Sequence, residues 1–213
     1  VTGSGEMKFA SYKAKEILLF WFGENIPYDE QSAIEERARQ VWFAQSEKID
    51  QEIRKRFEPD LEAVTEPMVE EIEDILEKLA MIILVDQFSR NIFREDSRAF
   101  VRDHLGLKLA KQMVAQNEDM KLKPFQRFFV YLPLEHSEDQ KDQEVSVAKF
   151  KKLSGEVPKK VRGIYQSFLD YAIKHKVIID KFGRYPHRNE ALGRKSTKEE
   201  LEFLKEPSSH FGR

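Results

Sequence analysis

The chain has 213 residues, of which 40% are hydrophobic, 35% charged and 11% aromatic, and its formal net charge is -2 at pH 7. This apolar content is sufficient for a hydrophobic core, and only nine glycines are present, which favours helices over disorder. The absence of cysteine excludes disulfides, a thiolate nucleophile and any cysteine-ligated metal site, and it fits a reducing compartment. A net charge near zero argues against general nucleic-acid binding.

Nothing in the sequence indicates a membrane segment. The longest apolar run, residues 79–85, is far shorter than the roughly 20 residues that cross a bilayer. No charged and then apolar leader precedes it, so we expect a cytoplasmic protein without a membrane partner. Residues 1–6, ahead of Met7, have the composition of an expression remnant and are left out of the functional interpretation. Residues 7–213 are then expected to form a single all-helical domain.

Hydrophobic residues recur at the helical period along most of the chain. The first helix is expected to follow Ser11, a second to cover about residues 28–45, and a third to end before Pro59. A long helix should begin after Pro67. This helix becomes apolar all round over residues 79–85, which places it at the centre of the fold.

The second half of the chain continues this pattern. A helix beyond residue 97 fades near residue 117, and another begins at Pro124. Pro133 should kink or end that helix, because its ring removes a backbone donor and clashes with the preceding turn. We therefore expect a break before His136, with Ser137 as the cap of the next helix.

The last part of the chain is expected to contain a long helix over residues 161–182, stopped by Gly183, and a short one capped by Ser196. No alternating strand pattern competes with these helices. We predict an all-α fold of eight to nine helices, arranged mainly as antiparallel hairpins with short loops. Such hairpins can stack without an exact sequence repeat.

The first of three polar clusters directly follows the apolar run. Asp86, Arg90 and Arg94 are spaced by four residues and so share one helical face, with Asn91 beside them. Because Asp86 adjoins the apolar run, we expect it to be buried and paired with an arginine. The cluster fits a network that secures the fold and an anion clamp equally well.

The second cluster spans residues 134–140 and contains Glu135, His136, Ser137, Glu138, Asp139 and Gln140. Helix capping by Ser137 and acidic residues in a first turn would explain most of it, but not Glu135 or His136. A histidine beside carboxylates is suited to general acid–base catalysis or to an oxygen-rich metal site. The spacings typical of zinc and di-iron sites are absent, so we assign no metal ligands, and no cofactor is indicated.

The third cluster lies in the loop after Gly183 and contains Arg184, His187 and Arg188. Guanidinium and imidazole groups on a proline-stiffened loop suit a phosphate or carboxylate, or they tie the loop to acidic residues. We expect this loop to fold back onto residues 86–94, with Arg184 or Arg188 compensating Asp86. His175, on the apolar side of the preceding helix, is interpreted as a core histidine.

Charge is also unevenly distributed along the chain. Residues 24–78 contain 17 acidic and 7 basic residues, whereas residues 141–195 contain 6 acidic and 14 basic residues. The simpler interpretation is that the two parts attract each other across solvated helix faces. The alternative is that the C-terminal part receives an anionic ligand.

Four separated segments carry a family resemblance: Phe20-Trp21-Phe22-Gly23, Asp86-Gln87-Phe88-Ser89-Arg90-Asn91, Leu132-Pro133-Leu134-Glu135-His136-Ser137-Glu138-Asp139, and Phe182-Gly183-Arg184-Tyr185-Pro186-His187-Arg188-Asn189 with Leu192-Gly193-Arg194. In the residues of these segments and in the order of the segments, the sequence strongly resembles the bacterial domain-of-unknown-function family 924 over nearly the whole chain. The resemblance implies a helical fold similar to tetratricopeptide-repeat domains, but no particular activity. Ser89 and Glu95-Asp96 depart from the family pattern, which has proline and a glycine-containing turn at these places.

We therefore hypothesise that the three clusters form one polar pocket that binds a small anionic ligand. If hydrolysis occurs there, His136 would be the acid–base residue, Glu138 or Asp86 would orient it, and Arg90 and Arg188 would hold the anion. The expected pocket residues are Asp86, Arg90, Asn91, His136, Glu138, His187 and Arg188. The alternative is a tetratricopeptide-like module that binds a peptide or protein, in which the polar clusters only secure the fold.

Overall fold

The structure, a computed structural model, describes residues 11–94, 96–207 and 209, and these residues contain eleven α-helices and six 3-10 or π-helical segments. The expected expression remnant, residues 1–6, lies outside these residues. The described chain contains no strand, so the fold class is all-α, as predicted. None of its helices is both long enough and apolar enough to span a membrane.

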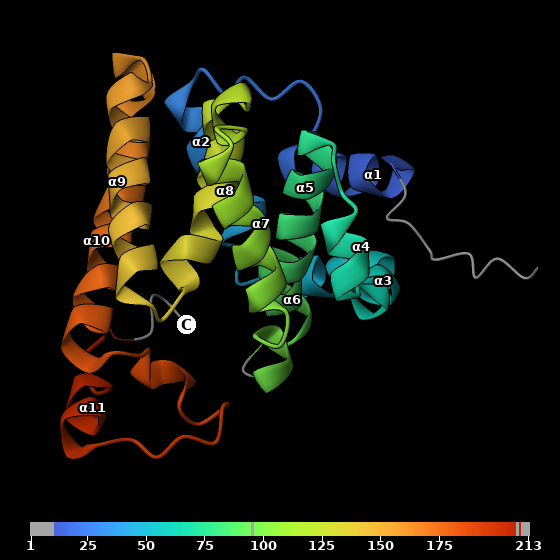
Figure 1. The fold of residues 1–213 in the computed structure, drawn as a ribbon. Coiled ribbons are helices and arrows are strands. Elements are labelled where there is room, and N and C mark those ends of the chain that lie inside the picture. The colour runs from blue at the N-terminus through green and yellow to red at the C-terminus, as the bar shows by residue number, and fades with distance from the viewer. Residues whose placement is uncertain (1–10, 95, 208, 210–213) are drawn as a thin grey trace, which may run out of the picture.

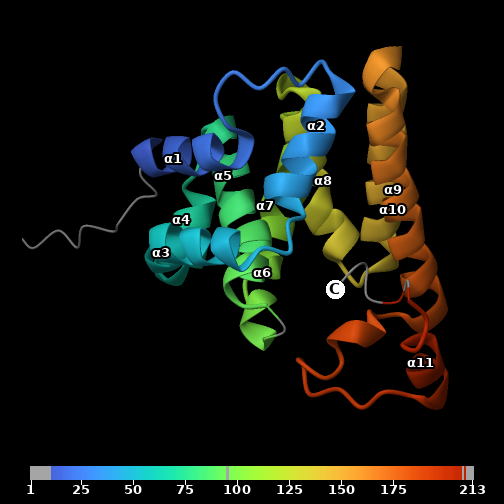
Figure 2. The same cartoon turned by 180° about the vertical axis from the view of Figure 1, so that it is seen from behind.

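The N-terminal elements lie on two sides of the centre of the molecule. They are α1 (Ser11–Phe22), α2 (Gln31–Arg37), the π-helical η1 (Ala38–Trp42), α3 (Glu47–Ala63) and α4 (Glu66–Glu70). In Figures 1 and 2, α1 and α3 lie on the far side of α5 (Ile75–Ile82) from α9 (Gln140–Glu156) and α10 (Arg162–Phe182), whereas α2 packs on α10. The helix α1 packs on α5, and α3 packs on residues 83–92, which follow α5.

The centre contains the most buried part of the chain. It comprises α5 (Ile75–Ile82), the π-helical η2 (Ile83–Phe88), α6 (Ser89–Ile92), η3 (Ser97–Ala99), α7 (Asp103–Ala115) and η4 (Asp119–Lys121). Every residue from 78 to 92 is buried, which agrees with the central position predicted from the apolar run.

Three long helices stand side by side at the C-terminal edge (Figure 1). The elements of this part are α8 (Pro124–His136), α9 (Gln140–Glu156), η5 (Lys159–Val161), α10 (Arg162–Phe182), η6 (Pro186–Arg188) and α11 (Lys198–Phe203). The helix α9 packs antiparallel between α8 and α10. As a consequence, α8 and α10 run in the same direction and end at the same side of the molecule.

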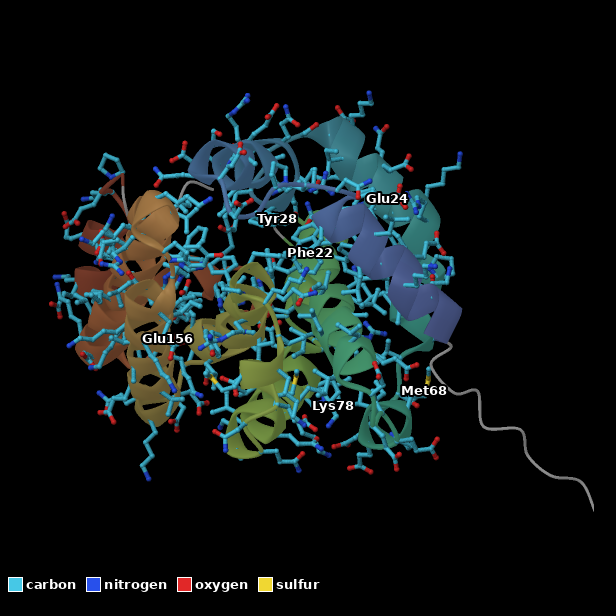
Figure 3. The ribbon with its side chains drawn as sticks, turned by 90° about the horizontal axis from the view of Figure 1, so that it is seen from above. Phe22, Glu24, Tyr28, Met68, Lys78 and Glu156 are labelled. Carbon is cyan, nitrogen blue, oxygen red and sulfur yellow. The ribbon has the colours of Figure 1, made fainter. Side chains whose placement is uncertain are left out.

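Aromatic side chains fill the core where α1, η1 and α8 meet. The ring of Tyr28 stacks on Phe125 with centroids 3.7 Å apart, and the ring of Phe22 meets Phe129 edge-on at 5.5 Å. Figure 3 shows Phe22 and Tyr28 close together beside the end of α1. Such edge-on and stacked pairs stabilise a core beyond the area that they bury.

Two prolines lie inside helices, although we expected a helix to end before Pro59 and Pro133 to kink or end the helix that contains it. The helix α3 continues through Pro59 to Ala63, and α8 continues through Pro133 to His136. A proline removes one backbone hydrogen bond, but tertiary packing supplies most of the stability of a helix in a protein. The predictions that a helix ends before Pro59 and that a break precedes His136 are therefore wrong.

The long helix expected after Pro67 is divided. Residues 71–74 separate α4 from α5, and Asp74 begins α5 by accepting hydrogen bonds from the N–H groups of Leu76 and Glu77 at 2.9 and 3.0 Å. A capping carboxylate of this kind satisfies backbone donors that have no partner within the helix. This division, together with the four-residue α6, accounts for helices beyond the eight to nine expected.

Two helix caps differ from the prediction by one or two residues. Asp139, not Ser137, accepts the hydrogen bonds from the first N–H groups of α9. Thr197, not Ser196, caps α11, and it does so in a capping box with Glu200. Serine, threonine and aspartate are nearly equivalent caps, so adjacent candidates cannot be distinguished by residue type alone.

The helix α7 lies close to η2 and α8 at Gly106, where an added Cβ would be 3.2 Å from Cγ2 of Val85 and 3.7 Å from Cγ of Pro133. Replacing Gly106 with valine is therefore expected to lower the free energy of unfolding by about 1–3 kcal/mol through overpacking. Gly155→Ala is the control, because a Cβ there meets no atom within 4 Å. Alanine has a higher helix propensity than glycine, so Gly155→Ala should raise the free energy of unfolding by about 0.5–1 kcal/mol. Urea denaturation measures the free energy of unfolding of both variants. If Gly106→Val is as stable as the wild type, the close packing at Gly106 is contradicted.

Candidate functional site

A cavity of about 380 Å³ lies between η1, the η2–α6 segment, α8, α10 and η6. Its volume is typical of small-molecule sites. The polar side chains that line it come from the η2–α6 segment, α8, α10, η6 and the segments after η1 and α6, and they are Gln45, Gln87, Arg90, Asn91, Arg94, Glu135, His136, Ser167, His175, His187 and Arg188.

Asp86 and His136 form a buried pair beside this cavity. Nδ1 of His136 lies 2.8 Å from Oδ1 of Asp86, and the carboxylate also accepts a 2.7 Å hydrogen bond from Nε2 of Gln87. Although burial opposes ionisation of Asp86, Arg90 and His136 hold the pKa of this carboxyl well below its usual range. An ionised carboxylate only accepts hydrogen bonds, so the proton must be on Nδ1. The Nε2 atom of His136 then has the lone pair that a general base needs.

Burial also lowers the pKa of His136, and the positive charge of Arg90 acts in the same direction, whereas Asp86 opposes it. The imidazole is therefore neutral at pH 7. Asp86 itself is not among the residues that line the cavity; it lies behind His136 and fixes the orientation of its ring. This is the geometry of a histidine base with an orienting carboxylate.

A second histidine and carboxylate pair lines the same cavity. Oε1 of Glu135 lies 3.1 Å from Nδ1 of His175, which also lies 2.8 Å from the backbone oxygen of Tyr171. Burial, and secondarily the charge of Asp86, raise the pKa of Glu135 to about 8. Burial lowers the pKa of His175 well below 6.5. At neutral pH Glu135 is therefore a carboxylic acid with a proton to donate. The ring centroids of His136 and His175 are 6.4 Å apart.

The two arginines at the site differ in how far their charge is compensated. Arg90 forms a two-pronged ion pair with Asp103, both bonds 2.9 Å long, and lies 3.3 Å from Asp86. Although burial opposes it, these two carboxylates raise the pKa of Arg90 above its ordinary value. Arg90 is thus part of an internal ion-pair network with Asp103 and Asp86. These carboxylates largely compensate its positive charge, so it would gain little from binding an anionic ligand.

Arg188 is less well compensated. It is 7% exposed, donates a 3.0 Å hydrogen bond to the backbone oxygen of His136, and lies between the rings of Phe100 and Tyr185 at 4.9 and 4.5 Å. Its distance to the Asp103 carboxylate is 3.9 Å, and Asp103 is already bound by Arg90. The buried Nε of Arg188 has no hydrogen-bond partner among the described residues. Burial and repulsion by Arg90 lower the pKa of Arg188, as expected for a cation that would be stabilised by an anion.

The end of α8 is held by side chains from two later elements. Nε2 of Gln143 donates to the backbone oxygens of Glu135 and Ser137 at 2.6 and 2.7 Å. The hydroxyl of Tyr185 donates to the same Glu135 oxygen at 2.5 Å. These bonds satisfy carbonyl groups at the C-terminal end of α8. They also fix the position of His136, the last residue of α8, beside the loop after α10.

The structure brings most of the sequence-predicted site residues together. Arg90, Asn91, His136, His187 and Arg188 line the cavity, and Asp86 contacts His136 directly. Glu138 lies elsewhere: its carboxylate binds Arg194 at 2.7 and 2.9 Å and accepts a hydrogen bond from the Tyr185 backbone at 2.8 Å.

The loop that contains Arg184, His187 and Arg188 folds back toward the site. In both ribbon views its short helix η6 lies next to the end of α8. Arg188 reaches His136 and Asp103, but Arg184 forms its ion pair with Glu200 at 2.7 Å. The direct partner of Asp86 is thus Arg90, and neither loop arginine compensates it.

Sequence reasoning did not assign a site role to Glu135, His175 or Asp103. Helix capping leaves Glu135 unexplained, and the break expected at Pro133 separates it from the inner face of α8, where it lies. His175 fitted a core histidine, and it is indeed buried, yet it lines the cavity. Asp103 starts α7 and shows no sequence signal apart from its position in a first helical turn.

These features define a class: an all-helical protein with a buried histidine and carboxylate site at one end of three packed helices. A family model described as "Bacterial protein of unknown function (DUF924)" matches residues 17–208, and the chain belongs to this family. It is similar in structure to the protein of unknown function ATU0120 from Agrobacterium tumefaciens, with 27% sequence identity and a TM-score of 0.73. That likeness covers 90% of this chain and 96% of the other. Among curated proteins, no sequence matches.

Proposed function

We propose that this protein binds a small anionic molecule in the cavity and hydrolyses an ester or amide bond in it. The observation that supports this proposal most strongly is that two histidine–carboxylate pairs, His136 with Asp86 and His175 with Glu135, meet at one cavity. His136 is a neutral base oriented by Asp86, and Glu135 is a carboxylic acid at neutral pH. Two titratable groups with environments that separate their pKa values are characteristic of acid–base sites.

The proposed reaction needs no group beyond water and these side chains. Nε2 of His136 takes a proton from a water molecule, whose oxygen attacks the acyl carbon of the ligand. As the bond to the leaving group breaks, Glu135 donates its proton to the leaving oxygen or nitrogen. The proton on His136 then returns to Glu135 through solvent, which restores both groups.

Arg188 is the proposed anion-binding residue. Its guanidinium carbon lies 4.9 and 4.5 Å from the ring centroids of Phe100 and Tyr185, and the charges of Asp103 and Glu138 compensate it incompletely, because its pKa is still lowered. An arginine in this state gains more from an anion than Arg90, which already binds Asp103 and Asp86. We therefore assign the anion to Arg188 and a supporting role to Arg90.

The alternative of a peptide-binding module stays a prediction, and it differs in what it expects of Arg188. If the polar network only secures the fold, loss of Arg188 should destabilise the protein. If Arg188 awaits a ligand, its removal relieves a buried and poorly paired charge at the cost of binding.

We expect Arg188→Met to lower affinity for small carboxylates and phosphates by about 10- to 100-fold, the usual loss for a charged hydrogen bond, while the melting temperature stays unchanged or rises. The matched control is Arg127→Met. Arg127 is also buried, but it binds Glu156 and Tyr131 outside the cavity. Loss of these bonds should lower the melting temperature without changing anion affinity. Calorimetric titration and thermal scans measure both effects; equal destabilisation in the two variants, with anion binding intact, would favour the scaffold.

A further inference from the structure

The cavity is divided along its length into a polar half and an apolar half. The polar half is the site described above. The apolar half is lined by residues from η1 and the segment after it, from α8 and from α10, and they are Ala38, Trp42, Phe43, Ala44, Phe128, Leu132, Ile164, Phe168 and Tyr171. Nothing in the proposed chemistry uses these residues, although they form half of the lining.

The division follows the two parallel helices. On α8, Phe128, Leu132 and His136 are spaced by four residues and so share one face. The same face thus changes from apolar to polar toward the helix end. At 1.5 Å per residue, Phe128 lies about 12 Å along the axis from His136.

The helix α10 repeats this order. Ile164, Phe168, Tyr171 and His175 line the cavity at spacings of three or four residues, again apolar first and polar last. Ser167 also lines this part, but its hydroxyl donates a 2.7 Å hydrogen bond to the backbone oxygen of Ile164 in its own helix. Because α8 and α10 run in the same direction, their apolar ends lie together and their histidines lie together. A ligand between them therefore meets a single boundary between a polar and an apolar region.

Two aromatic side chains that line the apolar half are largely exposed. Phe43 is 52% exposed and Tyr171 is 49% exposed, although both are large and could be covered by a ligand. The Phe43 ring meets Phe128 edge-on at 6.1 Å, and Phe128 packs on Phe168 at 4.1 Å. An aromatic wall thus continues from the interior to the rim of the cavity.

We propose that the ligand is an amphipathic acid, with one carboxylate or phosphate group at Arg188 and one aromatic or branched apolar arm that extends along Phe128 and Phe168 toward Phe43. This inference rests on the proposed anion site, because the same cavity must hold both parts. The bond to be cleaved lies between them, at the level of His136. Sugars and polyanionic chains are disfavoured, because they would place polar groups against the aromatic wall without hydrogen-bond partners.

The test compares acids that differ only in the apolar arm. Calorimetry with acetate and 6-phenylhexanoate, and separately with inorganic phosphate and 4-phenylbutyl phosphate, measures the effect of an arm that is long enough to reach from Arg188 toward Phe128 for each anion. Burial of a phenyl ring should tighten binding by about 10- to 100-fold within each pair. The two series also distinguish a carboxylate ligand from a phosphate ligand by their absolute affinities.

The double substitution Phe43→Ala and Tyr171→Ala should remove at least five-fold of this gain while leaving the affinity for acetate unchanged. Because both side chains are exposed, the protein should still fold. Val177→Ala is the control: Val177 is 58% exposed on the same helix α10 but does not line the cavity. It should keep the full gain.

The outcomes separate the two proposals. If the phenyl-bearing acids bind no more tightly than the small anions, while binding still depends on Arg188, the amphipathic ligand is rejected and the anion site stands. If the gain persists in the double variant, the arm does not lie along this wall and the inference is rejected. If no acid binds in an Arg188-dependent manner, the proposed function fails and the inference fails with it.

Discussion

Replacing Glu135 with glutamine is expected to stabilise the protein at neutral pH. The pKa of Glu135 is raised from 4.5 to about 8 in the folded chain, so between these pH values the folded state keeps a proton that the unfolded state releases. Stability therefore falls by about 1.4 kcal/mol for each pH unit in this range. The contribution of Glu135 is fully present below pH 4.5 and is lost as pH rises through about 8. Glutamine has no proton to release and escapes this loss.

At pH 7 the gain in Glu135→Gln should be on the order of 3 kcal/mol, which corresponds to a melting temperature higher by about 5–10 °C for a protein of this size. At pH 4 the variant and the wild type should be equally stable. Thermal scans between pH 4 and pH 9 measure the difference. A difference that does not change with pH would show that Glu135 is ionised in the folded state, and its role as an acid would be withdrawn.

Glu138→Gln is a matched control with the opposite sign. Although burial opposes ionisation, hydrogen bonds from Arg194 and from the Tyr185 backbone lower the pKa of Glu138. Its stabilising contribution is therefore present above pH 4.5 and is lost as pH falls through the lowered value. Glutamine at this position should destabilise the protein at pH 7 and have little effect in acid.

Loss of the His136 imidazole is expected to have the largest effect on activity. With a chromogenic ester of an amphipathic acid as substrate, His136→Gln should lower kcat by about 10²- to 10⁴-fold, the usual contribution of general base catalysis. The control is His104→Gln, because His104 is exposed on α7 and does not line the cavity. Wild-type turnover in His136→Gln would remove this histidine from the mechanism.

The pH profile of the same assay tests the roles of both groups. Activity requires neutral His136 and protonated Glu135, so it should rise as pH passes the lowered pKa of His136, below 6.5, and fall near pH 8. Glu135→Gln should remove the alkaline limb and lower the maximum. A purely structural Glu135 would leave the shape of the profile unchanged.

The helical fold could be predicted from the sequence because the hydrophobic period is strong in nearly every helix. Errors occurred where a local rule competed with packing. Pro133 obeys the rule for helix ends in isolation, but α8 packs against α7 and α9 on both sides and continues for three more residues. If the helix ended at Pro133, Glu135 and His136 would not share a helical face with Phe128 and Leu132. The expected break therefore concealed the change from apolar to polar side chains along α8.

Site residues could be identified by type but not by partner. Asp86 and Glu138 were equal candidates for orienting His136, since both are acidic and both adjoin a helix end. The choice depends on how α8 packs against η2 in space, which brings Asp86 within 2.8 Å and leaves Glu138 to Arg194. Compensation of Arg90 by Asp103 likewise depends on the packing of α7, and no spacing in the sequence encodes it.

The π-helical segment η2 has a consequence for how insertions and deletions affect this chain. Each residue in a helix turns the following side chains by about 100°, and the wider π turn contains one residue more than an α turn. Because the wider turn takes up this extra residue, deleting one apolar residue from 83–88 would let the segment relax to an α-helix and would keep α6 in phase with α5. Side chains inside the segment would nevertheless move to new angular positions. Asp86 lies inside it, so its contact with His136 would be lost while Arg90 and Asn91 keep their direction. The length of this segment therefore constrains the site more tightly than the identity of its apolar residues.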